Sequence, residues 1–244
     1  MPATAPPATA FALPFAPACP RCRSALDING DAAHCARCAE TYRCEGGIWR
    51  FLPAERAARF ASFLAQYETV RAAEGWGRPD PAYYAALPRV PADDPQRAIW
   101  RLRSRHYRAL IARVVCPLER ARGRPLAVLD LGAGNCWLAH RLARRGHRVA
   151  AVDLSTDRLD GLGARAWYGD FAPFAAVQAD YEHLPCEAGQ FDLAIFNASL
   201  HYAADCTAAL GEALRALRAD GRLAVLDTPV YRDPTSGARM VRER

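Results

Sequence analysis

Four cysteines near the N-terminus have the spacing of a metal site. Cys19 and Cys22 form one C-x2-C pair, and Cys35 and Cys38 form a second pair further along the chain. Each two-residue spacer lets one tight turn direct two thiolates toward the same ion, and two such pairs complete the tetrahedron that structural Zn²⁺ requires. The spacing therefore predicts a zinc ribbon with Cys19, Cys22, Cys35 and Cys38 as ligands.

His34 and Cys44 lie beside these pairs, and either could replace one ligand. The alternative is four unrelated free cysteines, which this paired spacing rarely produces. We expect the ribbon to be a module separable from the rest of the chain. Substitution of Cys19 by serine should then remove the metal and leave the remaining core folded.

A second chemical pattern combines an acid with glycines. An apolar run ending at Asp130 is followed by Gly132 and Gly134 and then by a helix start. Glycines there let the backbone turn tightly and approach a ligand without a Cβ in the way. A dinucleotide fingerprint would place a third glycine at position 137, but this chain has Trp137. The loop therefore departs from the dinucleotide-binding fingerprint.

The D-x-G-x-G pattern of this loop resembles class I S-adenosylmethionine (SAM)-dependent methyltransferases. The cofactor of that family has a cationic amino acid and a sulfonium, so a nearby carboxylate is electrostatically favourable. The family usually has glycine where this chain has Cys136. A non-glycine residue with positive φ costs about 1 kcal/mol. We therefore expect Cys136 in ordinary helical geometry, narrowing the methionine end of the pocket.

The resemblance covers about residues 125–230 and implies further contacts. It implies that Asp153 accepts hydrogen bonds from the ribose hydroxyls and that Asp180 contacts the adenine amino group. In a cap before the core, Arg71 would close over the cofactor's carboxylate, although a surface arginine is an equal alternative. For any single acid, a helix N-cap is the alternative role. The cofactor-binding set is Asp130, Gly132, Gly134, Asn135, Asp153, Leu154, Asp180, Tyr181, Asn197 and Arg71.

Methyl transfer is an in-line displacement that needs alignment and, for some acceptors, removal of a proton. His201, with Tyr202 beside it, is our candidate for the base or acceptor-orienting group. A structural histidine is an equal alternative.

Strands and helices must position these residues. The alternation beyond Pro125 predicts an α/β fold: a Rossmann-like, mostly parallel sheet with helices on both faces. The strands are expected at Leu126–Leu131, Arg148–Asp153, Phe174–Asp180, Phe191–Asn197 and Arg222–Asp227. The helices are expected at Ala54–Glu74, Gln96–Val115, Cys136–Arg145 and Cys206–Leu217.

Four regions follow from these patterns. They are a flexible tail (1–17), the zinc ribbon (18–53), a helical cap or linker (54–124) and the methyltransferase core (125–244). Few residues follow Asp227, too few for the two strands that usually complete this sheet. We therefore expect either a truncated chain or an oligomer in which another chain covers the sheet edge.

The net charge of +6 raises the alternative of nucleic-acid binding. All 32 basic residues are arginine, which indicates a bias of the whole sequence. One local excess remains, and we favour a solvated helix face over a phosphate-binding surface for it. Its members are Arg101, Arg103, Arg105, Arg108, Arg113, Arg120, Arg122 and Arg124.

Three functions compete. A small-molecule methyltransferase is favoured by the aromatic, proline-rich cap and by a resemblance to the ubiquinone/menaquinone group. An RNA methyltransferase is favoured by the arginines and by Thr41–Pro53, which resembles the end of zinc ribbons that accompany tRNA and release-factor methyltransferases. The third is a non-catalytic, partner-dependent subunit. No apolar run reaches the roughly 18 residues of a membrane span, and no secretory signal is present, so we expect a cytoplasmic protein.

Overall fold

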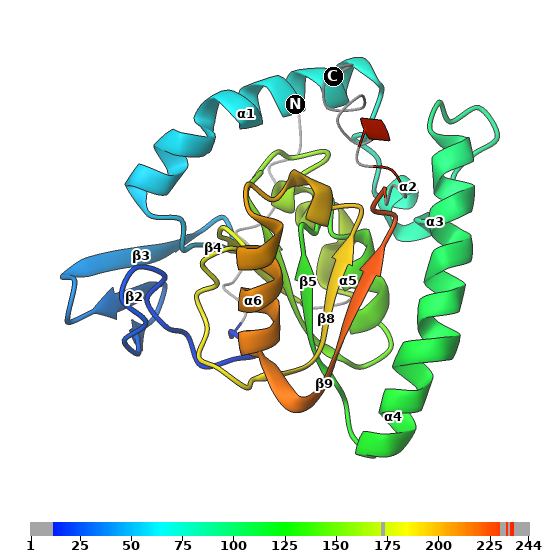
Figure 1. Ribbon diagram of the computed structural model, residues 1–244. Helices are drawn as coiled ribbons and strands as arrows, with labels where there is room; N and C mark the ends of the chain where they lie inside the picture. The colour runs from blue at the N-terminus through cyan, green and yellow to red at the C-terminus, as the bar shows by residue number, and fades with distance from the viewer. Residues whose placement is uncertain (1–11, 172–173, 230–232, 234, 237–244) are drawn as a thin grey trace.

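The computed structural model describes residues 12–171, 174–229, 233 and 235–236. One nine-stranded sheet runs through it in the order β1-β2-β3-β4-β7-β6-β5-β8-β9 (Figure 1). The strands are β1 (Asp27–Asn29), β2 (Ala32–Cys35), β3 (Glu40–Glu45), β4 (Ile48–Arg50), β5 (Ala127–Leu131), β6 (Arg148–Asp153), β7 (Ala175–Gln178), β8 (Phe191–Asn197) and β9 (Leu217–Leu226).

The strands from β4 to β9 pair in parallel, as a Rossmann-like sheet requires. β5 lies between β6 and β8, and every residue of β5 is buried. Its apolar run has no alternation because helices cover both faces of the sheet. The predicted fold class is confirmed. β6 and β8 have the predicted bounds, whereas β9 begins at Leu217 because α6 ends directly in extended backbone there.

Helices surround the parallel strands. α6 packs on one face of the sheet, and α5 packs on the other face with the long α3–α4 helix beside it (Figure 1). The α-helices are α1 (Ala54–Ala73), α2 (Pro81–Ala86), α3 (Arg97–Leu110), α4 (Cys116–Arg122), α5 (Trp137–Ala143) and α6 (Cys206–Ala216). Within the part of the chain described here, no helix has the length and hydropathy of a membrane span.

The helix predicted to end at Val115 is longer than expected. A π-helical turn at Ile111–Val115 joins α3 to α4, and the helix ends at Gly123, whose φ is +59°. Pro117 cannot donate the i→i−4 hydrogen bond of an α-helix. The π turn precedes this proline, so the helix continues across a residue that we took as beyond its end.

The cysteine-rich hairpins are part of the same sheet as the core. β4 pairs in parallel with β7, with Trp49 opposite Val177. Trp49 stacks on Phe51 with 5.5 Å between ring centroids, and both belong to one hydrophobic cluster with Leu129 and Val177. The ribbon therefore shares strand pairing and buried aromatic surface with the core, which argues against a separable module.

The described part of the predicted flexible tail packs against the core. Residues 1–11 lie outside the described part of the chain, but Phe15 is buried with its ring 5.6 Å from that of Phe191. Ala18 N–H donates to the carbonyl of Pro185 at 3.1 Å. The segment just before Cys19 therefore packs on the core, because Phe15 supplies apolar surface that the composition of the tail did not suggest.

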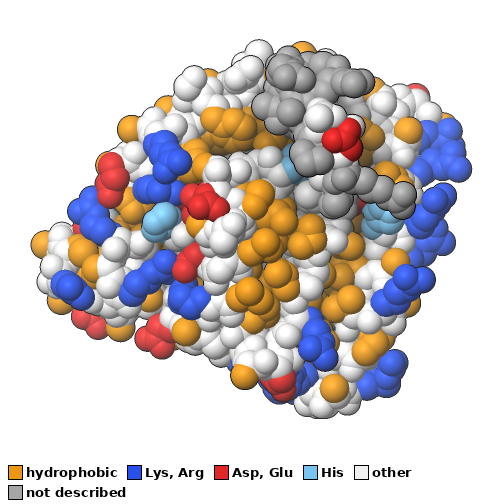
Figure 2. Space-filling view, viewed as in Figure 1, with side chains coloured by type: hydrophobic (Ala, Val, Ile, Leu, Met, Phe, Trp, Pro, Cys, Tyr) orange, Lys and Arg blue, Asp and Glu red, His pale blue; other side chains and the backbone are white. Residues whose placement is uncertain are grey.

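The other end of the sheet has no such cover among the described residues. β9 pairs with β8 alone, as predicted for the last core strand. Leu214 on α6 and Val225 on β9 are 59% and 43% exposed. Figure 2 shows apolar side chains gathered on this face over α6 and the neighbouring strands.

Candidate active site

The loop between β5 and α5 approaches the chain that follows β8. Gly132 has a φ of +71°, and a Cβ on it would lie 2.2 Å from the Cβ of Ser199. The Ser199 hydroxyl donates to the carbonyl of Leu131 at 2.5 Å, which holds the two segments together. No side chain larger than hydrogen fits at Gly132 without moving one of them.

Asp153, at the end of β6, fastens this loop from the other side. Its carboxylate accepts the N–H groups of Gly134 and Ser155, each at 2.8 Å. Burial raises the pKa of Asp153 to about 6, although the two hydrogen bonds act in the opposite direction. Each carboxylate oxygen has a further lone pair, so the group can still accept hydrogen bonds from hydroxyls.

Asp130 is the least satisfied acid of the site. Both its carboxylate oxygens are buried and have no hydrogen-bond partner among the described residues. Burial and then the nearby Asp153 raise the pKa of Asp130 to about 7. A buried carboxylate without a partner is costly unless a cation or donor approaches it. The electrostatics of the loop therefore suit a positively charged ligand.

A small cavity of about 60 Å³ lies over this loop. Among the predicted cofactor residues, it is lined by Gly132, Gly134, Asp153, Leu154 and Tyr181. The remaining lining residues come from α1, from the chain after β6 and from the chain after β8, and no sequence motif indicated any of them except Tyr202. They are Phe63, Leu64, Tyr67, Ser155, Ala198, Ser199 and Tyr202.

Five predicted cofactor residues do not line this cavity: Arg71, Asp130, Asn135, Asp180 and Asn197. The side-chain oxygen of Asn135 accepts the N–H of Trp137 at 3.4 Å, at the start of α5. Asp180 forms an ion pair with Arg56. Asn197 is half-buried at the end of β8. Their cofactor contacts stay predictions.

Cys136 differs from our expectation. Its φ is +63°, in the left-handed region, and its side chain is buried. The N–H of Cys136 bonds to the carbonyl of Ala133 at 2.9 Å, so the tight turn continues through Cys136 before α5 begins. Ordinary helical geometry was expected for its lower local energy, but the loop imposes this conformation at a cost of about 1 kcal/mol.

A larger cavity of about 920 Å³ adjoins the small one. Four residues line both cavities: Phe63, Tyr67, Ala198 and Tyr202. His201, our other catalytic candidate, lines the larger cavity alone. Arg71 lies there as well, and its guanidinium bonds to both oxygens of Asp160, one of them at 3.1 Å.

Three further residues line this larger cavity and come from two segments that are distant in sequence. His106 on α3 forms a hydrogen-bonded pair with Asp227. Asp227 directly follows β9 and has a φ of +52°. Arg103 lies one turn earlier on α3. Sequence reasoning missed their roles because no local motif indicates that α3 and the end of β9 meet.

The four predicted metal ligands come together. The sulfurs of Cys19, Cys22, Cys35 and Cys38 all lie within 4.8 Å of one another, and Cys22 Sγ is 3.5 Å from Cys35 Sγ. Zn–S bonds of about 2.3 Å put tetrahedral sulfurs roughly 3.8 Å apart, so the donors fit zinc.

The two spare ligands lie outside this group. His34 Nδ1 is 3.2 Å from the hydroxyl of Thr41. Cys44 is a half-buried free thiol, and burial raises its pKa. Neither residue belongs to the four-sulfur cluster.

Comparison with known proteins agrees with this geometry. Residues 129–225 match the family described as "Methyltransferase domain". The matched residues contain Asp130, Asp153 and the glycine-rich loop, whereas the cysteine cluster and α1–α4 lie outside them.

Two curated relatives are similar to part of this chain. A malonyl-[acyl-carrier protein] O-methyltransferase of Hahella chejuensis is 37% identical over 103 residues, covering 41% of this chain and 36% of the relative. A ubiquinone biosynthesis O-methyltransferase of Psychrobacter cryohalolentis is 34% identical over 115 residues, covering 45% and 42%. The chain thus matches less than half the length of these relatives.

Among solved structures, a Pyrococcus horikoshii protein superposes with a TM-score of 0.41 at 23% identity. The superposition covers 56% of this chain and 59% of that chain.

Proposed function

We propose that this protein is a SAM-dependent methyltransferase. The observation that carries the proposal is the buried carboxylate of Asp130, two residues before Gly132, which has no hydrogen-bond partner among the described residues. A ligand with a cationic amino acid and a sulfonium would compensate this charge, whereas a pyrophosphate would repel it. The matched methyltransferase family supports the same cofactor.

The residues divide the work of holding the cofactor. Asp153 would accept the ribose hydroxyls, and Leu154 and Tyr181 supply apolar walls beside it. Ligand pockets usually have volumes of about 300–1,000 Å³. The present small cavity is far below that range. Helix α1, which has no buried residue, would therefore move outward to admit the cofactor.

Bound SAM supplies an activated methyl group for in-line displacement. Tyr202 lines both cavities, so its ring would lie at the boundary between the cofactor and the acceptor. His201 lines only the larger cavity, where it would orient the acceptor or take its proton. These two roles rest on position.

We propose a small-molecule acceptor for the larger cavity. Its volume is in the usual range for a small ligand, and the two relatives' names refer to O-methylation of malonyl-acyl-carrier protein and in ubiquinone biosynthesis. RNA is the second candidate, favoured by the exposed side chains of Arg101, Arg105 and Arg113 on α3 and the π-helical turn after it.

Methyl-labelled SAM distinguishes the two acceptors. The protein is incubated with labelled SAM and either a protein-free metabolite extract or total RNA. We expect label in the metabolite fraction and none in ribonuclease-sensitive precipitate. Label in RNA alone would replace the small-molecule proposal by the second candidate. No transfer to either, with the cofactor bound, would favour the partner-dependent subunit.

We also propose that the four-cysteine cluster holds one structural zinc, in a cytoplasm that keeps thiolates reduced. Because β4 pairs with β7, loss of the metal should destabilise the core as well as the ribbon. Elemental analysis should find one zinc per chain, and Cys19→Ser should lower it and the unfolding temperature together. Cys206→Ser, at an exposed thiol outside the cluster, should change neither. Absence of stoichiometric zinc would contradict the proposal.

A second copy of the chain, or another partner, is proposed to cover the β9 edge. The support is the single pairing of β9 among the described residues and the exposure of Leu214 and Val225. An unpaired edge favours association. Light scattering should give a mass above that of one chain, and a catalytically active monomer would contradict this proposal.

A further inference from the structure

The larger cavity has apolar walls that stay exposed to it. Four of the most exposed large hydrophobic side chains among the described residues line this cavity: Phe63, Val70, Ile99 and Leu102, each between 39% and 47% exposed. Two come from α1 and two from α3, so they face the space between the helices. Exposed apolar area concentrated in one cavity indicates a ligand with an apolar body.

Among the described residues that line this cavity, Arg103 is the one arginine whose guanidinium has no ion pair. Its Nε is buried without a hydrogen-bond partner, and no ion pair involves its guanidinium among the described residues. The guanidinium carbon lies 4.9 Å from the ring centroids of both Trp76 and Trp100. These indoles are buried, so cation–π contacts fix the orientation of Arg103.

The carboxylates near Arg103 are engaged elsewhere. Asp160 pairs with Arg71, and Asp227 pairs with His106. Glu74 accepts the indole N–H of Trp76 at 2.8 Å. Burial lowers the pKa of Arg103, and the nearby Arg71 lowers it further, so the charged form is incompletely compensated. A bound anion would compensate the positive charge of Arg103, which no carboxylate of the protein pairs with among the described residues.

We propose that Arg103 binds the carboxylate of an acceptor that has an apolar or aromatic body, and so determines which acceptors enter the cavity. This inference rests on the proposed methyltransferase function and names its class of acceptor. A monoanion matches the single unpaired guanidinium, and the body of the ligand would contact Val70, Ile99 and Leu102. Arg103 is a binding residue here and takes no proton.

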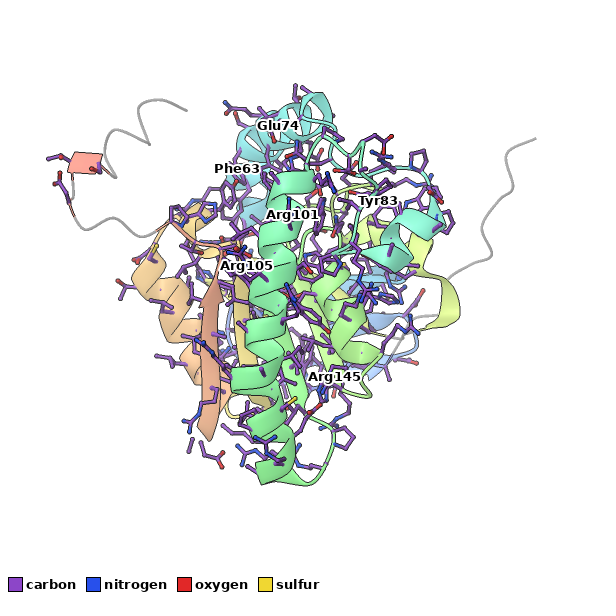
Figure 3. The ribbon with its side chains drawn as sticks, turned by 90° about the vertical axis from the view of Figure 1, so that its right-hand side faces the viewer. Phe63, Glu74, Tyr83, Arg101, Arg105 and Arg145 are labelled. Atoms are coloured by element: carbon purple, nitrogen blue, oxygen red, sulfur yellow. The ribbon has the colours of Figure 1, made fainter. Side chains whose placement is uncertain are left out.

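The test uses the full chain with S-adenosylhomocysteine bound and two probes of nearly equal shape. Calorimetry measures binding of 3-phenylpropanoate and of its uncharged amide. The variants are Arg103→Gln and the control Arg105→Gln, which removes the same charge from an exposed position of α3 (Figure 3). We expect the wild type and the control to bind the carboxylate at least about tenfold more tightly than the amide. Arg103→Gln should abolish that preference and leave amide binding unchanged.

Equal binding of the two probes by the wild type, binding of neither, or an unchanged preference in Arg103→Gln would overturn the inference. If Arg103→Gln does not fold by near-ultraviolet circular dichroism, Arg103→Lys replaces it. That variant keeps the charge but loses planar contact with the indoles, so it should retain a preference weaker than that of the wild type. A reduced or lost preference in a folded Arg103→Lys would support the site, whereas a full preference would contradict binding through the planar guanidinium of Arg103. Binding of S-adenosylhomocysteine, measured first, tests the proposed function separately.

Discussion

The two adjoining cavities differ in how their walls are assembled. The small cavity is formed largely by residues at the ends of neighbouring parallel strands, such as Gly132 and Asp153. The larger one is formed by α1, α3 and the residues after β9, which are far apart in sequence. Strand ends of a parallel sheet meet at one edge whatever the surrounding helices do. The cofactor site could therefore be predicted from local motifs, whereas the acceptor site depends on tertiary packing.

The largest effect on the small cavity is expected from the addition of a single methyl group. Gly132→Ala places a Cβ 2.2 Å from the Cβ of Ser199, in addition to the cost of its φ of +71°. We expect binding of S-adenosylhomocysteine to be lost and the free energy of unfolding to fall by about 2–4 kcal/mol. Calorimetry and urea unfolding measure these two effects.

Gly189→Ala is the matched control for this substitution. Gly189 has a φ of +70°, but nothing lies within 4 Å of its added Cβ. It should therefore cost about 1 kcal/mol of unfolding free energy and leave cofactor binding intact. If the two substitutions have equal effects, the loss of stability comes from strain at positive φ. The clash with Ser199 then contributes nothing.

A smaller effect is expected when the ribose acceptor is removed. Asp153→Ala should weaken SAM binding by about 1–3 kcal/mol, because a charged hydrogen-bond acceptor is lost. Calorimetry of the variant measures this change, and Asp27→Ala on the exposed strand β1 serves as its control. Unchanged SAM affinity in Asp153→Ala would remove this residue from the cofactor site.

The pH dependence of SAM binding should show the smallest change. Burial raises the pKa of Asp130 to about 7 and that of Asp153 to about 6, above their ordinary values. Stability of the unliganded protein should therefore fall as pH rises from about 4 through 7, since the unfolded chain releases these protons first. A cationic ligand favours the ionised acids, so SAM affinity should rise by on the order of tenfold between pH 5.5 and 7.5. Calorimetry at the two pH values measures this rise, and Asp130→Asn should reduce it.

Much of the fold and half of the site could be predicted from the sequence. The apolar runs that became β6 and β8, and the glycines after Asp130, have local patterns that parallel sheets and tight turns require. The pairing of β4 with β7 could not be predicted, because an edge strand accepts many partners. Arg103 was grouped with solvated arginines, and only packing against Trp76 and Trp100 distinguishes it from Arg101 and Arg105.

The most direct test of the central claim compares two ligands of the glycine-rich loop. Calorimetry of the purified protein at pH 7.5 titrates S-adenosylhomocysteine and NAD in separate experiments. The unpartnered Asp130 and the absence of a third glycine at Trp137 predict one site for S-adenosylhomocysteine and no detectable binding of NAD. Tighter binding of NAD than of S-adenosylhomocysteine would contradict the account.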